Sequence, residues 1–380
     1  MTADTHKELV CLLRILRGEV PEFSDIDRPK FVYTLKFHRM ISLVGDKIIS
    51  GQIDYLEKQI KDEVLILQQA GLVLKSALRK ALLETAHSLS SAEIPFIVIK
   101  GFHLSENIYP GYEARLFSDN DILVGREDFG RAAKILQDAG YIITQGLHSR
   151  FSVEQCAKLG ISRPYHHSEA GFLQIDLHSR LSINPGLIYL DDEDCWENTN
   201  VMDLDGTSLT VLPSAVNLAY LSWHSLKHSV SRIVWFRDLY LYMKKEPGVL
   251  EQVKFFELLD RYRLRKMTAS VLLTAAKIFN DNELSATVEK IFSGARRLDQ
   301  KYFAPEKLLA VRDEISPLDR TLRDLRIIEK NVDRLSYLWR SFFPEPDLLP
   351  ELKSKTGLNF NYLANRIQAL SKAVMSIRNN

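Results

Sequence analysis

The chain has 380 residues, of which 46% are hydrophobic and 26% charged, and its formal net charge is +1 at pH 7. That length is enough for two or three domains with a sizeable core, and the composition is that of an ordinary soluble globular protein. Because the positive and negative charges nearly cancel, they give no electrostatic argument for a long nucleic acid or an anionic membrane as partner.

The cysteines and the first residues indicate the cellular compartment of the protein. Cys11, Cys156 and Cys195 are odd in number and far apart, which fits neither a disulfide framework nor a zinc site and favours a reducing compartment. The first twenty residues mix charges with leucines, as an amphipathic helix does and a signal peptide does not. No apolar run is long enough to span a membrane. We therefore expect a cytoplasmic protein that has no membrane partner.

The N-terminal part of the chain is predicted to be helical. Apolar residues recur at three- and four-residue spacing in 8–18 and 62–92. A short β-branched run at 94–101, ended by Gly101, predicts a buried strand. A short helix is expected at 103–109.

The middle of the chain alternates between strands and helices. A second strand is predicted at 121–125, a helix at 126–141 and a third strand at 141–146. Two extended runs within 163–181 predict a hairpin.

From about residue 213 the pattern is helical again. The long amphipathic segment 214–245 comes first, and further helices are expected at 251–263, 267–280, 318–343 and 360–378. The prediction is an α+β protein with a small mixed sheet flanked by helices. Its expected parts are an N-terminal helical segment (1–90), an α/β core (91–212) and a C-terminal helical domain (213–380).

Two aspartates directly precede the apolar part of the second predicted strand. Side chains alternate between the faces of a strand, so Asp119 and Asp121 share one face and Asn120 lies opposite. Two carboxylates on one face repel each other unless a cation lies between them. Mg²⁺ is the hard cation that oxygen ligands usually bind.

A third aspartate, Asp176, lies inside another apolar run, Gln174–Leu177. If its strand pairs beside the first, three carboxylates meet. Such a group can hold divalent ions on a phosphoryl group during transfer.

The order of these motifs resembles the polymerase-β-type nucleotidyltransferase superfamily. It is more similar to a bacterial nucleotidyltransferase family with the pattern Leu-Lys-Gly, Arg, Asp-x-Asp-Leu-Leu-Val and Asp-Leu-His. The resemblance covers roughly residues 60–245. The matching positions in this chain are Lys100-Gly101, Arg115, Asp119-x-Asp121, Ile175-Asp176-Leu177-His178, and the helical His224-x-x-x-His228 with Trp235 and Asp238 after it.

The resemblance implies a role for each matching position. Asp119 and Asp121 would bind the metals, and Asp176 would bind the catalytic metal and help to deprotonate the attacking group. Gly101 would let the phosphates approach the backbone, and Lys100 and Arg115 would neutralise phosphate charge. The implied cofactor is Mg²⁺, with Mn²⁺ as an alternative, and a nucleoside triphosphate is the implied substrate.

Several histidines and one arginine are further candidates for nucleotide binding. His178 shares a strand face with Asp176 and is either an orienting residue or a core histidine. His224 and His228 lie one helical turn apart, where they could line the cleft, bind a metal or make structural contacts. Arg232, one turn further, could reach a phosphate or pair with Asp238.

Two features depart from the wider superfamily. Phe102 follows Gly101 where serine or glycine is usual, and 18 positions separate Gly101 from Asp119 (119 − 101 = 18). The expected reaction is Mg²⁺-dependent transfer of a nucleotidyl group to a small-molecule, sugar-phosphate or peptide acceptor, and no long nucleic acid is expected. Two alternatives stay open: a sugar-nucleotide-dependent glycosyltransferase-like enzyme, and a degenerate nucleotide-binding or assembly module.

Overall fold

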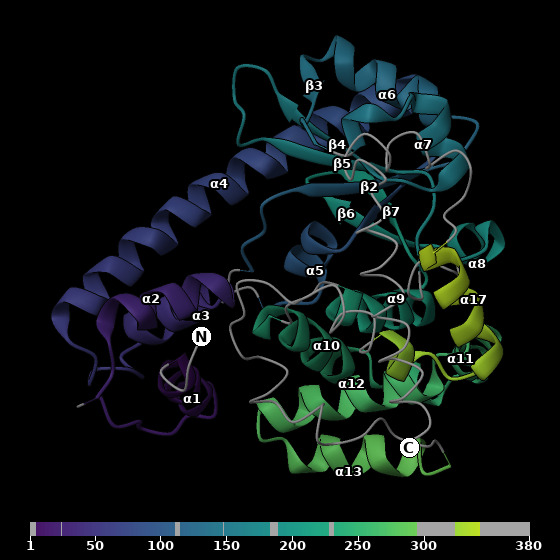
Figure 1. Ribbon diagram of the computed structural model, residues 1–380. Helices are drawn as coiled ribbons and strands as arrows, with labels where there is room; N and C mark the ends of the chain where they lie inside the picture. The colour runs from purple at the N-terminus through teal and green to yellow at the C-terminus, as the bar shows by residue number, and fades with distance from the viewer. Residues whose placement is uncertain are drawn as a thin grey trace, which may run out of the picture.

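The computed structural model describes residues 5–23, 25–110, 115–146, 148–182, 189–227, 232–294 and 324–342. In these ranges, helices surround one mixed sheet (Figure 1). The strands are β1 (Phe96–Ile99), β2 (Asn120–Val124), β3 (Tyr141–Ile143), β4 (Arg163–His167), β5 (Gln174–His178), β6 (Asn200–Leu204) and β7 (Thr207–Val211).

The helices fall into three groups along the chain. The first group is α1 (Thr5–Leu16), α2 (Arg28–Phe37), α3 (Ile41–Ile49) and α4 (Lys58–Ser91). Between the strands lie α5 (Gly101–Asn107), α6 (Phe129–Asp138), the short 3₁₀ helix η1 (His148–Arg150), α7 (Val153–Leu159) and α8 (Asp192–Trp196). The last group is α9 (Ser214–Lys227), α10 (Ile233–Lys245), η2 (Pro247–Glu251), α11 (Val253–Arg261), α12 (Arg265–Ile278), α13 (Asn282–Ile291) and α17 (Asn331–Phe342).

The sheet places the two acidic strands side by side at its centre. The strand order is β3-β4-β5-β2-β1-β7-β6. Strand β2 is parallel to β5 and antiparallel to β1, and β1 is parallel to β7. The remaining neighbours, β3–β4, β4–β5 and β6–β7, are antiparallel.

Each face of the sheet has its own hydrophobic core. Phe96 and Val98 on β1 pack in a core with the C-terminal half of α4 and with α6. Ile97 and Ile99, which point the other way, belong to a core built from the N-terminal helices and from α9 to α13. Burial on both faces explains why the central strands are apolar without interruption.

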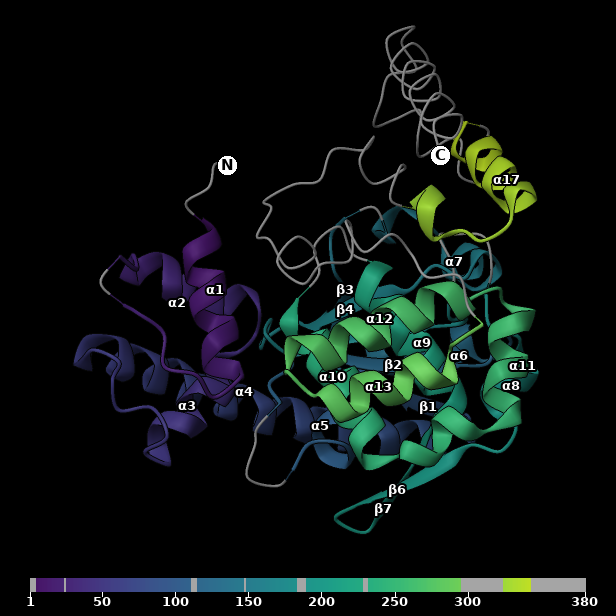
Figure 2. The same cartoon turned by 90° about the horizontal axis from the view of Figure 1, so that it is seen from below.

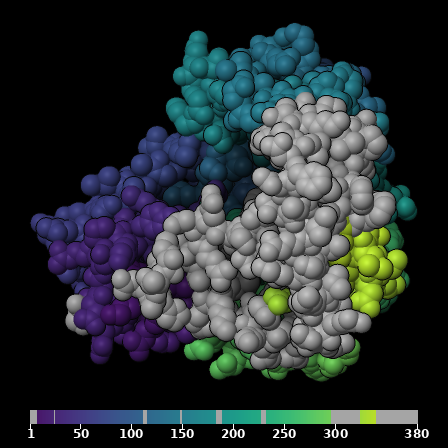
Figure 3. Space-filling view, in the orientation of Figure 1, coloured from purple at the N-terminus to yellow at the C-terminus, as the bar shows by residue number. Residues whose placement is uncertain are grey.

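Two further views place the helical groups. In Figure 2 the helices α10, α12 and α13 form a layer over β1 and β2, and α1 to α3 lie beside that layer. In the space-filling view the N-terminal helices lie at the lower left, below the part that contains β3 and α6 (Figure 3). The helix α4 runs between these two parts (Figure 1).

The structure confirms the predicted α+β class with a mixed sheet. The predicted strands at 94–101, 121–125 and 141–146 correspond to β1, β2 and β3, and the predicted hairpin is β4–β5. The expected helix at 360–378 and the first part of that at 318–343 lie outside the described residues. The division into three domains stays a prediction.

The structure corrects one prediction. The segment 214–245 is not one helix, since α9 ends at Lys227 and α10 begins at Ile233. Arg232, just before α10, has an extended backbone (φ −111°, ψ 143°), which no helix interior accommodates.

The sequence analysis also missed the hairpin β6–β7. Its signal is the Asp205-Gly206 pair, in which both residues have positive φ (52° and 81°), as a two-residue hairpin turn requires. In the described ranges, no helix combines the length and hydropathy needed to cross a membrane.

Candidate active site

The centre of the site is a pair of aspartates on neighbouring parallel strands. In the register of β2 and β5, Asp121 is the direct partner of Asp176. His178 lies two residues after Asp176, so strand alternation places it on the same face. Ligand atoms of Asp121, Asp176 and His178 all lie within 4.8 Å of one another. The three side chains therefore form one compact group. They lie on the face of the sheet that the N-terminal helices and α9 to α13 cover.

Asp121 is the most enclosed member of this group, with a side chain that is 6% exposed. Its Oδ1 accepts a hydrogen bond from Lys100 Nζ at 2.5 Å and lies 2.9 Å from His178 Nε2. Burial alone would raise the pKa of Asp121, but the positive charge of Lys100 and the bond to His178 hold that pKa below its ordinary value. Asp121 is thus an anion, with a cation already against it.

Lys100 reaches Asp121 from the end of β1, where its backbone is unusual. Its φ of 56° and ψ of −125° lie in a region that favours glycine. Such a conformation costs of the order of 1–3 kcal/mol and persists only where the surroundings fix it. Here the ion pair with Asp121 is buried, since the lysine side chain is only 13% exposed.

Asp119 lies just before β2 and is half-buried. Ser118 Oγ donates to its Oδ1 at 2.9 Å, and Arg39 Nη2 donates to the same hydroxyl at 3.1 Å. Burial and the nearby charge of Asp121 raise the pKa of Asp119, although Lys100 opposes them. Asp119 therefore interacts electrostatically with Asp121, but it does not belong to the compact group of three.

Arg115 lies in a buried ion pair with Asp238 of α10. Its Nε and Nη2 donate to the two carboxylate oxygens at 2.6 Å each, and Tyr109 Oη donates to the same carboxylate at 2.8 Å. Asp238 is therefore the partner of Arg115, and Arg232 does not pair with it. The predicted contact of Arg115 with phosphate stays a prediction.

Gly101 has a packing reason to be glycine. A Cβ on this residue would lie 3.0 Å from Phe117 Cβ and 3.2 Å from Arg115 Nη1. These distances are shorter than ordinary van der Waals contact, so two neighbouring side chains fill the space that a larger residue would need. The predicted approach of phosphates to this backbone is untested.

The candidates His224 on α9 and Arg232 just before α10 are not members of the compact group of Asp121, Asp176 and His178. His224 is half-buried, and its ring packs edge-on against Trp235 at a centroid distance of 5.5 Å. Arg232 lies over the rings of Phe37 and Trp235, at 5.5 and 5.6 Å. His228 lies outside the described residues.

Two residues near the site were missed in the sequence. Arg39 follows α2 and reaches Ser118 across 79 residues of sequence. His38 is fully buried, and its Nδ1 and carbonyl oxygen accept from the backbone N–H groups of Ile233 and Val234. No local pattern marks either residue, because the contacts depend on how the end of α2 packs against distant segments, the one before β2 for Arg39 and the start of α10 for His38.

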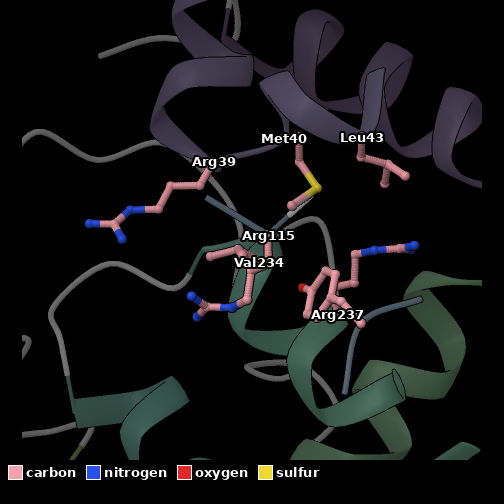
Figure 4. A pocket seen from close by; sticks show the side chains of 7 residues that line it. Arg39, Met40, Leu43, Arg115, Val234 and Arg237 are labelled. Carbon is pink, nitrogen blue, oxygen red and sulfur yellow. The ribbon is translucent and has the colours of Figure 1, made fainter. Parts of the chain in front are cut away.

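Residues from the N-terminal helices and from α10 line a small cavity (Figure 4). Its lining is mixed, with arginines and apolar side chains from both sides: Arg39, Met40, Leu43, Tyr109, Arg115, Val234 and Arg237. The volume is about 10 Å³, which is the size of a single water molecule.

Comparison with known proteins places the chain in a family. A family model described as "Uncharacterised nucleotidyltransferase" matches residues 24–280, which is more than half of the chain. The chain belongs to this nucleotidyltransferase family. The match is wider than the resemblance seen in the sequence, and it takes in α2, α3 and Arg39.

Other comparisons add little to the nucleotidyltransferase assignment. No curated protein matches the chain. Among solved structures, the nucleotidyltransferase is similar to the lincomycin-bound lincosamide antibiotic adenylyltransferase LnuA, at 14% sequence identity and a TM-score of 0.30. That alignment covers 43% of this chain and 94% of the other, and a similarity this low carries no argument about substrate.

The donor atoms of the nucleotidyltransferase fit a divalent metal ion. Asp121 and Asp176 offer carboxylate oxygens, which hard cations prefer, and His178 adds an imidazole nitrogen. The ion pair of Asp121 with Lys100 shows that the negative charge of this group already binds one cationic side chain. The compact group of Asp121, Asp176 and His178 can therefore hold a divalent metal.

Proposed function

We propose that the chain is a Mg²⁺-dependent enzyme that moves a nucleotidyl group from a nucleoside triphosphate to a small-molecule, sugar-phosphate or peptide acceptor. The observation that carries this proposal is the direct pairing of Asp121 with Asp176 on parallel strands, with His178 beside them. Carboxylate oxygens this close together, beside an imidazole nitrogen, are ligands that a hard divalent cation can bind.

In this proposal Asp119, Asp121 and Asp176 hold Mg²⁺, for which Mn²⁺ could substitute. The bound metal supplies neutralisation of charge on the donor phosphates and on the leaving diphosphate. Asp119 faces the group from the end of the strand, where it is half-buried. His178 fixes the orientation of the Asp121 carboxylate through their 2.9 Å contact.

Asp176 is the residue that we assign to the acceptor. It is half-buried, unlike the enclosed Asp121, so an acceptor hydroxyl can approach it. The acceptor oxygen forms a bond to the α-phosphorus of the donor, and the bond from that phosphorus to the diphosphate breaks. The proton of the hydroxyl passes to Asp176, and the diphosphate leaves with its electron pair.

Lys100 and Arg115 contribute positive charge close to the reacting phosphates. Lys100 is held by Asp121 and Arg115 by Asp238, so both are fixed in place before a substrate arrives. Such preorganised charge stabilises a developing negative charge without further rearrangement.

A small acceptor suits the chain better than a long nucleic acid. The formal net charge is only +1, whereas tracking a phosphate backbone needs a basic surface. The described cysteines Cys11, Cys156 and Cys195 are free thiols, which fits the cytoplasmic location that we propose.

The test is a thermal-shift screen of the purified chain. ATP, GTP, CTP, UTP and several sugar nucleotides are compared with and without Mg²⁺, in the wild type and in Asp121→Asn and Asp176→Asn. We expect one triphosphate to raise the melting temperature only with Mg²⁺, and both variants to lose that rise. Asp62→Asn, at an exposed position of α4, is the matched control and should keep it.

The products separate the proposal from its alternatives. Nucleotidyl transfer releases diphosphate and leaves the nucleotide on the acceptor. Release of a nucleoside diphosphate from a sugar nucleotide would indicate glycosyl transfer instead. Nucleotide binding that is unchanged in Asp121→Asn would contradict the metal site and favour a binding module.

A further inference from the structure

The turn after α2 brings a cation next to Asp119. Arg39 Nη2 donates to Ser118 Oγ at 3.1 Å, and that hydroxyl lies 2.9 Å from Asp119 Oδ1. Arg39 is therefore joined to the proposed metal-binding aspartate through a single side chain. Its side chain points away from Met40 and Leu43, which lie against α10 (Figure 4).

A second cation comes from the first residue before α10. Arg232 lies above the rings of Phe37 and Trp235, which hold its guanidinium on two sides. The charge of Asp119 opposes the lowering of the pKa of both Arg39 and Arg232, which agrees with a place for both guanidinium groups near that carboxylate.

These two arginines repel each other. Burial and the charge of Arg232 both lower the pKa of Arg39, and neither arginine forms an ion pair with any residue that the structure describes. This differs from Arg115 and Lys100, which each contact a carboxylate. Asp119 offsets part of this repulsion, but no carboxylate of the described residues lies within ion-pair distance of either guanidinium, so both can still bind the oxygens of an anion.

The backbone holds this arrangement in place. His38, the neighbour of Arg39, accepts hydrogen bonds from the N–H groups of Ile233 and Val234 at 3.3 Å each. The turn after α2 is thereby fastened to the start of α10, next to Arg232. Arg39 itself has a φ of 56°, where asparagine or glycine would be less strained. That conformation ends α2, since the Met40 N–H donates to the Leu35 carbonyl oxygen at 2.9 Å.

We propose that Arg39 and Arg232 form an anion subsite beside Asp119, which binds a phosphate group of a substrate. This rests on the proposed function, because it is the donor or acceptor of that reaction that supplies the phosphate. Guanidinium groups bind phosphate oxygens through paired hydrogen bonds. The phosphate belongs either to the triphosphate tail of the donor or to a phosphorylated acceptor.

The subsite gives the N-terminal helices a part in substrate binding. Asp121 and Asp176 come from the sheet, Arg232 from the start of α10 and Arg39 from the turn between α2 and α3. A substrate phosphate at this place would contact the turn after α2 and the start of α10, next to the sheet residues that carry the proposed metal site. Its affinity would then depend on salt, since two of its contacts are charged.

The experiment is titration calorimetry with Arg39→Gln and Arg232→Gln. Arg28→Gln is the matched control, because Arg28 is an arginine of α2 that pairs with Glu57 at the surface. The probes are tripolyphosphate and the four nucleoside triphosphates with Mg²⁺, and inorganic phosphate. Urea unfolding confirms that each variant is folded, and Arg39→Lys tests whether charge alone suffices.

If the phosphate belongs to the donor, Arg39→Gln and Arg232→Gln each weaken tripolyphosphate and triphosphate binding by about tenfold or more, and Arg28→Gln does not. If it belongs to an acceptor, triphosphate binding is unchanged. Inorganic phosphate, titrated with the triphosphate already bound, then binds about tenfold more weakly to both variants.

The subsite is overturned if Arg39→Gln and Arg232→Gln bind every probe as the wild type does. Failure of the proposed function has a different result, because Asp121→Asn would then leave Mg²⁺-dependent binding unchanged. In that case inorganic phosphate alone still tests the two arginines, since its binding needs neither metal nor nucleotide.

Discussion

Arg115 and Asp238 form a buried ion pair with two hydrogen bonds of 2.6 Å, between residues that lie 123 positions apart. The pair fastens the segment before β2 to α10. The positions of Asp119 and Asp121 therefore depend on a helix that follows the sheet in sequence. Tyr109, which donates to the same carboxylate, completes the contact.

Asp238→Ala should lower the free energy of unfolding by about 3–5 kcal/mol, because it leaves the Arg115 guanidinium buried without its partner. Both side chains are almost fully enclosed, at 5% and 2% exposed. Urea unfolding measures the change. The control is Asp192→Ala, which removes an exposed pair with Arg126 and should cost less than about 1 kcal/mol. Equal losses in the two variants would contradict the buried pair.

Gly101→Ala should lower the free energy of unfolding by about 1–3 kcal/mol, because its Cβ would press on Phe117 and Arg115. Gly130→Ala is the matched control. It lies in α6, where the nearest atom to a new Cβ is Val153 Cγ1 at 3.9 Å. There alanine should stabilise by about 0.5–1 kcal/mol, since it favours the helix. Chemical denaturation of both variants checks the contrast, and a Gly101→Ala protein as stable as the wild type would show that the space is open.

Lys100→Met should make the chain bind Mg²⁺ more tightly. Lys100 contacts Asp121 and so repels a metal ion at the same carboxylate. Removing this charge should raise the affinity for Mg²⁺ at least about tenfold, or about 1.4 kcal/mol. The same variant should be less stable without metal, because Asp121 loses its counter-ion.

Calorimetric titration of Mg²⁺ into the two proteins measures the change in affinity. Lys75→Met is the control, since Lys75 pairs with Glu106 away from the acidic group. An unchanged or weaker affinity for Mg²⁺ in Lys100→Met would mean that the lysine supports the metal.

His38 should make the protein sensitive to acid. Burial and the charge of Arg232 lower the pKa of His38 to about 3 from an ordinary value of 6.5. Between these two values the unfolded chain binds a proton that the folded chain does not. The contribution of His38 is therefore complete above about pH 6.5 and declines as the pH falls towards 3, by up to about 1.4 kcal/mol per pH unit.

The check is urea unfolding at pH 7 and pH 5 for the wild type and His38→Asn. The asparagine oxygen can still accept the hydrogen bond from Ile233 N–H, but it does not titrate. We expect the wild type to lose about 2 kcal/mol more than the variant over this interval. Equal losses would show that His38 is not the group responsible, and would leave the buried His103, whose pKa burial lowers to about 4, as the next candidate.

The sequence by itself determined the strands that carry the site, β1, β2 and β5, and which of their side chains share a face. The alternation of side chains is local, so it placed Asp119 and Asp121 on the same face of one strand, and Asp176 and His178 on the same face of the other. The Asp-x-Asp motif and the Asp-Leu-His run indicated the family, which the family model then confirmed. Each of these features lies within a few residues of chain.

The tertiary structure alone decided which groups surround the carboxylates. The pairing of Asp121 with Asp176 depends on strand register, and the contacts of Lys100, Arg115 and Arg39 depend on how β1, α10 and α2 pack. The pairing of Arg115 with Asp238 was not expected from the sequence, and the contact of Arg115 with phosphate stays a prediction. A single sequence carries no local signal for such contacts, because they join residues up to 123 positions apart. The periodicity of apolar residues shows which face of a helix or strand is buried, but not which other element packs against it.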